Sequence, residues 1–214
     1  MKVLVACEYS GVVRDAFLRR GYFAMSCDLL PTESPGPHYE GDVRDVLGYG
    51  WDLMIAHPDC TYLCSSGLHW NKRVPGREEK TLAALDFVRL LMSAPIKRKA
   101  IENPVGRIGS AIRPASQYIQ PYEYGHDASK RTCLWLEGLP PLVATSHVPG
   151  RVVGYRANGK PIERWSNQTD SGQNRLSPSA DRWKERARTY EGWADAMAEQ
   201  WGPIVWAEAM KVAA

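Results

Sequence analysis

The sequence predicts an α/β protein with a mostly parallel sheet in a three-layer arrangement. Segments with strand-like and helix-like patterns alternate from residue 2 to residue 103, the order of repeated strand–helix–strand units. One of them, WDLMIAH at residues 51–57, is an unbroken apolar run, which is typical of a strand buried on both faces of a parallel sheet. A chain of 214 residues, 44% of them apolar, is also long enough to bury a substantial core.

The first half of the chain supplies most of the predicted sheet. Strands are predicted at residues 2–7, 23–28, 51–57 and 97–104. A helix is predicted after the first strand, where Ser10 can cap it. A second helix is predicted from Glu78 to Ser93, because apolar side chains recur on one face at helical spacing. These side chains are Leu82, Leu85, Val88, Leu91 and Met92.

The second half of the chain is less regular. Further strands are predicted at residues 117–125 and 132–138, and a last helix from about Asp181. The polar stretch before that helix is rich in Gly, Ser, Asn and Arg and predicts a small basic loop or lobe, a candidate nucleic-acid contact. The expected organisation is a core at residues 1–142, this lobe at 143–180, and a C-terminal helix at 181–214 that packs back on the core.

Charge and cysteine content constrain the environment and the partners. The formal net charge of +3 does not by itself require a polyanionic partner, but basic residues outnumber acidic ones from 151 to 188, where we expect any phosphate-binding face. Five cysteines without regular spacing, and no signal-peptide pattern, predict free thiols and a cytoplasmic location. No apolar run approaches membrane-spanning length, so no membrane partner is expected.

Polar side chains follow the predicted strands at the edge where ligands bind in parallel α/β sheets. The turn CEYSG places Tyr9, Ser10 and Gly11 ahead of a helix, whose backbone N–H groups can hold a ligand. Asp28 follows the second strand and suits hydrogen bonds to ribose hydroxyls in Rossmann-like sites; the alternative is a cap or solvated turn. Asp42 can accept a bond from an adenine amino group, or can belong to a surface turn.

Cys60 lies just beyond the apolar run in LMIAHPDCTYLCSSG, in a loop over the same edge. There a thiolate can attack an electrophile if a positive environment lowers its pKa, whereas the neighbouring Asp59 raises it. An inert buried thiol is the ordinary role of a free cysteine. A zinc site is a further interpretation, although the spacing of its candidate ligands matches no usual zinc motif. Those ligands are His57, Cys60, Cys64 and His69.

Two more charged residues lie next to predicted strands. Glu102 in AIENP emerges from an apolar strand, where scarce water raises the pKa of a carboxyl group and suits it to proton donation. A salt bridge or a capping role is the alternative for Glu102. Arg131 precedes the strand at 132–138 and can direct a fixed charge into the same cleft, although an arginine before a strand is more often solvated.

Together these residues resemble the DNA cytosine-C5 methyltransferase family. Cys60 matches the nucleophile of that family's Pro-Cys motif, and Glu102 with Asn103 matches its Glu-Asn pair. YGHDASKR loosely matches its Tyr-Gly followed by Gln-x-Arg, with Arg131 at the arginine, and CEYSG resembles its cofactor turn. The resemblance covers the core and a closing helix that contains TYEGWADAMAEQ.

The chain also departs from this family. Asp59 and Thr61 stand where the family has proline and glutamine, and the target-recognition domain is reduced to residues 143–180. The resemblance is to compact, phage-type members, and it implies the cytoplasm of a bacterium or an infected host.

The resemblance implies a Rossmann-like methyltransferase fold that binds S-adenosylmethionine and acts on DNA. Asp28 and Asp42 would contact the ribose and adenine of the cofactor. Cys60 would add to C6 of an extruded cytosine, Glu102 would assist at N3, and Arg131 would help hold the base. Two other classes stay open: a pyrimidine-modifying enzyme that acts on free nucleotide or RNA, and a non-catalytic nucleotide- or DNA-binding protein in which Asp59 marks lost reactivity.

Overall fold

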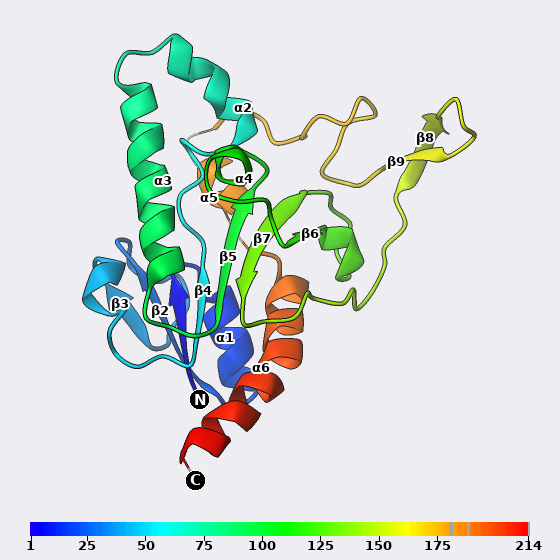
Figure 1. The fold of residues 1–214 in the computed structure, drawn as a ribbon. Coiled ribbons are helices and arrows are strands. Elements are labelled where there is room, and N and C mark those ends of the chain that lie inside the picture. Colours follow the sequence, from blue (N-terminus) through cyan, green and yellow to red (C-terminus); the bar gives the residue numbers. More distant parts are fainter. Residues whose placement is uncertain (180–181, 188, 214) are drawn as a thin grey trace.

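The computed structural model describes residues 1–179, 182–187 and 189–213, and its centre is one seven-stranded sheet (Figure 1). The strands are β1 Lys2–Ala6, β2 Phe23–Asp28, β3 His38–Glu40, β4 Leu53–Ala56, β5 Lys99–Pro104, β6 Gln117–Ile119 and β7 Thr132–Glu137. They lie in the order β3-β2-β1-β4-β5-β7-β6, and β1 to β5 pair in parallel. Only β7 runs against its neighbours β5 and β6. The predicted mostly parallel α/β sheet is confirmed.

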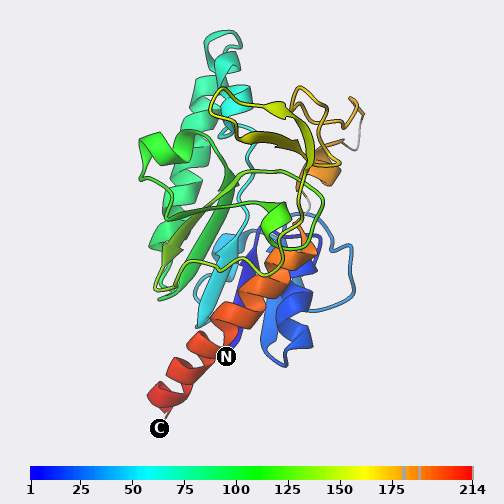
Figure 2. The ribbon, with the colours of Figure 1, turned by 90° about the vertical axis from the view of Figure 1, so that its right-hand side faces the viewer.

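Helices cover both faces of this sheet. The α-helices are α1 Val12–Arg19, α2 Ser65–Leu68, α3 Arg77–Ser93, α4 Arg107–Ala111, α5 Arg182–Ala187 and α6 Glu191–Ala213. Three short 3-10 helices connect other elements: η1 Val43–Asp45, η2 His69–Lys72 and η3 Pro121–Glu123. Figure 1 shows α3 on one side of the sheet, and Figure 2 shows α1 and α6 together on the other.

The alternation of side chains along the strands divides the core into two halves. In β1, Val3 and Val5 pack in the cluster that includes α1 and α6, whereas Leu4 and Ala6 pack in the cluster that includes α3. All four side chains are fully buried. A strand that is apolar on both faces in this way requires a helix layer on each side of the sheet.

Several element boundaries differ from the sequence prediction. β3 was not predicted, because it has only three residues and lies at the sheet edge. The strand predicted at 117–125 ends at Ile119, since Pro121 cannot donate to a ladder and instead starts η3. The predicted last helix is two helices, α5 and α6, with residues 189 and 190 non-helical between them. Its expected start, Asp181, lies outside the described residues.

The face of α3 also differs slightly from the prediction. Leu85, Val88 and Leu91 are buried as expected, but Leu82 is half exposed, at 51%. Thr81 is buried in its place and donates a hydrogen bond to the carbonyl of Tyr62 at 3.0 Å. The polar side chain of Thr81 thus attaches the first turns of α3 to the neighbouring loop.

The predicted lobe contains a two-stranded hairpin, β8 Arg151–Tyr155 and β9 Pro161–Arg164, separate from the main sheet (Figure 1). Trp165, directly after β9, stacks on Tyr122 with ring centroids 3.9 Å apart, and its indole N–H donates to the carbonyl of Val148. Asn167 exchanges two hydrogen bonds of 2.9 Å with the backbone of Ser129. These contacts attach the lobe to the loop that precedes β7.

The strand order determines where a ligand can bind. Apart from the inserted β7, the order 3-2-1-4-5-6 is that of a doubly wound sheet, whose connections reverse direction between β1 and β4. In such sheets the ligand crevice lies beyond the carboxyl ends of the strands at this reversal.

Within the described residues, no helix combines the length and apolar character needed to cross a membrane.

Candidate functional site

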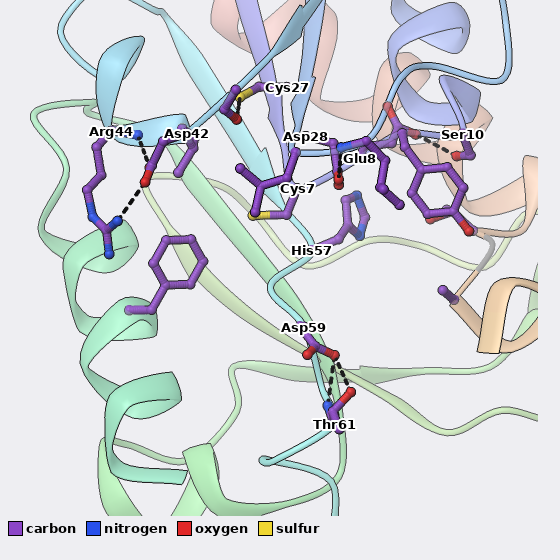
Figure 3. Close-up of a pocket in the computed structure, with 18 residues that line it drawn as sticks. Cys7, Glu8, Ser10, Cys27, Asp28, Asp42, Arg44, His57, Asp59 and Thr61 are labelled. Carbon is purple, nitrogen blue, oxygen red and sulfur yellow. Dashed lines mark hydrogen bonds and ion pairs between the residues drawn. The ribbon is translucent and has the colours of Figure 1, made fainter. Parts of the chain in front are cut away.

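A cavity of about 600 Å³ lies beyond the carboxyl ends of β1 to β4, at the reversal point of the sheet (Figure 3). This volume is in the range of small-molecule and cofactor sites. Its lining comes from four strand ends, from α3 and from the segment between α5 and α6. The residues are Cys7 to Ser10, Cys27 to Leu30, Gly41 to Arg44, His57, Asp59, Thr61, Phe87, Ala187 and Thr189.

The turn between β1 and α1 forms one wall of the cavity, and Glu8 organises it. Glu8 is 4% exposed, and its carboxylate accepts hydrogen bonds from the backbone N–H groups of Val13, at 2.7 Å, and Arg14. Ser10 donates to the same carboxylate at 3.3 Å. The predicted capping role of Ser10 therefore belongs mainly to Glu8, which satisfies the first free N–H groups of the helix. Burial raises the pKa of Glu8.

Gly11 is the N-cap residue of α1, in the left-handed conformation with φ 76°. A Cβ atom there would lie 2.4 Å from a terminal nitrogen of Arg14, which is itself fully buried. The Arg14 guanidinium donates to Ser26, to Thr32 and to the carbonyl of Ser34. Gly11 thus shapes the turn and makes room for an arginine that holds the loop after β2, but it does not line the cavity.

Asp28 and Asp42 both line the cavity, as the sequence predicted for a ligand site, but their carboxylates have different partners. Asp28 uses Oδ1 to accept from the backbone N–H of Leu30 at 3.0 Å, and burial raises its pKa. Asp42 caps η1: Oδ1 accepts from the N–H of Arg44 and Oδ2 from its guanidinium at 2.7 Å. Asp42 therefore belongs to a turn, the alternative role expected from the sequence.

His57 links the cavity to Glu102. Its Nδ1 lies 3.2 Å from Oε2 of Glu102, and both side chains are nearly 90% buried. His57 lines the cavity, whereas Glu102 lies behind it. Two buried atoms of this pair, His57 Nε2 and Glu102 Oε1, have no hydrogen-bond partner in the described structure. Such atoms are costly unless a ligand or water satisfies them.

The loop that carries Cys60 is fixed against the end of β5. Asn103 donates from its amide to the carbonyl of Pro58 at 2.7 Å. The N–H of Arg107 donates to the carbonyl of Leu63 at 2.7 Å, and the N–H of Ser65 to that of Val105. A side chain on Gly106 would collide with the Leu63 carbonyl, because a Cβ atom would lie 1.9 Å from its oxygen. These contacts bring the Cys60 loop and the Glu102–Asn103 pair together.

The protonation state of Glu102, beside the Cys60 thiol, differs from the prediction. Burial raises the pKa of the Cys60 thiol to about 11, and the neighbouring Cys64, Asp59 and Glu102 act in the same direction. Burial also acts to raise the pKa of Glu102, but the hydrogen bond from His57 and the charge of Lys130 outweigh it, so this pKa is lowered. The pair is therefore a thiol beside a carboxylate near neutral pH. The raised glutamate pKa expected from the sequence was wrong, because the partners of Glu102 lie elsewhere in the chain.

Arg131 does not lie where a cleft-directed cation was expected. Its side chain is exposed, and the guanidinium carbon lies 4.1 Å from the ring centroid of Tyr118 on β6. Arg131 does not line the cavity. The interaction with Tyr118 is a cation–π contact on the outer part of the sheet.

The candidate zinc ligands are not gathered into a site. Within the described residues, no three His, Cys, Asp or Glu side chains are arranged to hold a metal ion. His57 contacts Glu102, Cys64 Sγ lies 3.3 Å from the hydroxyl of Ser66, and His69 lies against Trp70. All five cysteines are free.

Sequence reasoning missed Glu8, Phe87 and Thr189 as site residues, and it named His57 as a candidate zinc ligand but not as the partner of Glu102. Glu8 had a local signal, since an acid at a strand end shortly before a helix can cap it. The roles of His57, Phe87 and Thr189 depend on contacts between distant segments and had no local signal.

A scan against protein-family models found no match for this chain, and a search of curated proteins found none either.

Proposed function

We propose that this protein transfers a methyl group from S-adenosylmethionine to C5 of cytosine in DNA. The proposal rests on the position of the cavity, because one of its walls lies next to Cys60 and Glu102. His57 and Asp59 line the cavity, His57 contacts Glu102, and Asp59 directly precedes Cys60. A ligand in the cavity would therefore lie next to a thiol and a carboxylate, the two groups that the resemblance assigns to the reaction.

The cavity residues fit this cofactor. Asp28 lines the cavity, and its carboxylate, which accepts from the backbone N–H of Leu30 through Oδ1, can also accept from ribose hydroxyls. Leu29, Val43 and Phe87 supply apolar surface for a purine ring. When bound, the cofactor would supply an electrophilic methyl group on its sulfonium.

The protonation states of Cys60 and Glu102 suit a balanced addition to the base. The thiol must lose its proton to add to C6, and N3 of cytosine must gain one. Glu102, a carboxylate at the start, can accept the proton of Cys60 and deliver it to N3, so that Glu102 returns to a carboxylate and Cys60 becomes a neutral thioether. The new S–C6 bond makes C5 electron-rich, so C5 would take the methyl group as its bond to the sulfonium breaks. Loss of the N3 and C5 protons, and of the sulfur as thiolate, would then restore the ring. The Thr132 hydroxyl also interacts with the Glu102 carboxylate, and Oε1, which has no partner at ordinary hydrogen-bond distance among the described residues, would contact the base.

Incubation with methyl-labelled S-adenosylmethionine tests this proposal. Duplex DNA, single-stranded DNA, RNA and free cytidine nucleotides are offered in parallel, and digestion of the product identifies the modified nucleoside. We expect 5-methylcytosine in DNA from the wild type and from Cys64→Ser, and none from Cys60→Ser. Label in RNA or free nucleotide alone would assign the second class of substrate instead.

One observation favours a second candidate, a non-catalytic nucleotide-binding protein. The pKa of Cys60 is raised to about 11, so little thiolate exists at neutral pH, and Asp59 contributes to this shift. Such a protein would bind S-adenosylmethionine in the same cavity but transfer no label to any of the nucleic acids.

A further inference from the structure

Lys130 and Arg131, which directly precede β7, lie on opposite faces of the sheet. In the antiparallel pair of β5 and β7, Glu102 lies opposite Leu134, so these two side chains share a face. Counting back from Leu134 in steps of two gives Thr132 and then Lys130, whereas Arg131 is in phase with Cys133. The alternation thus puts Lys130 on the face of Glu102.

The contacts of the two cations agree with their placement on opposite faces of the sheet. Arg131 lies over Tyr118, and Tyr118 is the register partner of Cys133 on β6. Lys130 extends to the other face, where its Nζ donates to the backbone carbonyl of Arg186 in α5 at 2.9 Å. Its backbone N–H is fixed by the side chain of Gln120 at 3.0 Å.

The charge of Lys130 acts on both groups of the proposed reaction. It lowers the pKa of Glu102 and opposes the rise in the pKa of Cys60. Asp59, Cys64 and Glu102 also act on Cys60, and all three disfavour the thiolate. Lys130 thus supplies a positive charge that favours the thiolate.

The same side chain reaches the wall of the cavity. Arg186, whose carbonyl accepts from Lys130, is followed by Ala187, and both Ala187 and Thr189 line the cavity. The backbone N–H of Gly192 donates to Nε2 of His126, so the loop before β7 holds this segment at a second point. The loop therefore binds the wall of the cavity, and the charge of its Lys130 acts on Cys60 and Glu102.

We propose that Lys130, and not Arg131, is the positioning cation of this site: it holds α5 against the cavity and stabilises the thiolate of Cys60 as it forms. The assignment of Cys60 as the reacting group rests on the proposed function. The position and the charge effect of Lys130 do not.

The test compares Lys130→Met with Arg131→Met, which removes the adjacent cation, in a Cys64→Ser background. Alkylation of Cys60 by iodoacetamide at pH 8 is followed by mass spectrometry, and binding of S-adenosylhomocysteine by calorimetry. We expect Lys130→Met to slow the alkylation about 3- to 10-fold, the effect of a pKa rise of about half to one unit. It should also weaken S-adenosylhomocysteine binding, because α5 loses its anchor. Arg131→Met should match the parent in both measurements.

Lys130→Arg should restore the alkylation rate, since it keeps the charge. Thermal unfolding identifies a variant that has lost its fold, and Lys130→Gln then replaces the methionine variant. Equal effects of the two methionine variants, or no effect of Lys130→Met on alkylation, would overturn the proposal. A wild type that transfers no methyl group, together with slower alkylation in Lys130→Met, would refute the proposed function and leave the role of Lys130 intact.

Discussion

Nδ1 of His57 lies 3.2 Å from Oε2 of Glu102, and this contact joins the end of β4 to β5 at the base of the cavity. Both side chains are nearly buried, and the contact fixes Oε2 of Glu102. In the part of the chain that the structure describes, Oε1 has no partner at ordinary hydrogen-bond distance, although the Thr132 hydroxyl also interacts with this carboxylate. A carboxylate held in one orientation, with one oxygen available, is suited to a single proton transfer at a defined position.

Substitutions of His57 should separate positioning from packing. In His57→Asn the amide nitrogen can replace Nδ1 and keep the bond to Glu102, whereas His57→Phe removes it. We expect the turnover number for methyl transfer to fall about 100-fold in His57→Phe, the cost of a misplaced catalytic group, and only a few-fold in His57→Asn. Steady-state kinetics check this, and equal losses in the two variants would show that the ring matters only for packing.

The lowered pKa of Glu102 predicts a pH dependence of stability. A carboxyl group with a lower pKa in the folded state stabilises the fold above its unfolded pKa of about 4.3, and this contribution is lost as the pH falls through the folded pKa. The difference in unfolding free energy between wild type and Glu102→Gln should therefore shrink from pH 7 to pH 3.5. Urea unfolding at a series of pH values measures this difference. A difference that grows toward low pH would contradict the direction of the shift.

Asp28 and Asp42 should differ in their effect on cofactor binding. Asp28→Ala removes up to two hydrogen bonds to ribose hydroxyls and should weaken S-adenosylhomocysteine binding about 10- to 100-fold. Asp42→Ala should change the affinity little, because both its oxygens bind Arg44, and should instead reduce stability by about 1 kcal/mol through loss of the η1 cap. Calorimetry and urea unfolding distinguish the two effects, and an affinity loss confined to Asp42→Ala would reverse these roles.

Gly11 and Gly21 provide a matched pair for the cavity turn. Both have positive φ, at 76° and 78°, but a Cβ atom on Gly11 would collide with Arg14, whereas one on Gly21 would have no atom within 4 Å. We expect Gly21→Ala to cost about 1 kcal/mol of stability through the left-handed conformation alone. Gly11→Ala should cost more and should also weaken cofactor binding, because displacement of Arg14 releases the loop at Thr32 and Ser34. Equal stability losses would show that Arg14 moves aside freely.

Much of the sheet could be predicted because its central strands carry their own signal. β1, β4 and β5 are apolar runs that end on polar residues, so both the strands and the ligand edge follow from the sequence. We expected Ser10, Asp28, Asp42, Cys60 and Glu102 to meet in one cleft at this edge. Ser10, Asp28 and Asp42 line one cavity there, whereas Cys60 and Glu102 lie outside its lining. The short β3 and the β8–β9 hairpin could not be predicted, because a few edge or surface residues show no clear periodicity.

The chemistry of the site was harder to predict than its location. His57 and Glu102 are 45 positions apart, so their contact depends on the pairing of β4 with β5. The face of the sheet on which Lys130 or Arg131 lies likewise depends on the register of β7 with β5, and no local pattern determines this register. The pKa values of Cys60 and Glu102 depend in turn on these tertiary contacts.

The most direct test of the account is a covalent trap on Cys60. Fluorine at C5 of cytosine cannot be removed as the proton is, so DNA that contains 5-fluorocytosine should hold the enzyme after addition and methyl transfer. With S-adenosylmethionine present, we predict a protein–DNA adduct that mass spectrometry places on Cys60, that persists in Cys64→Ser and that is absent in Cys60→Ser. An enzyme that methylates cytosine but forms no adduct, or an adduct on another residue, would contradict the claim that the reaction proceeds through this thiol.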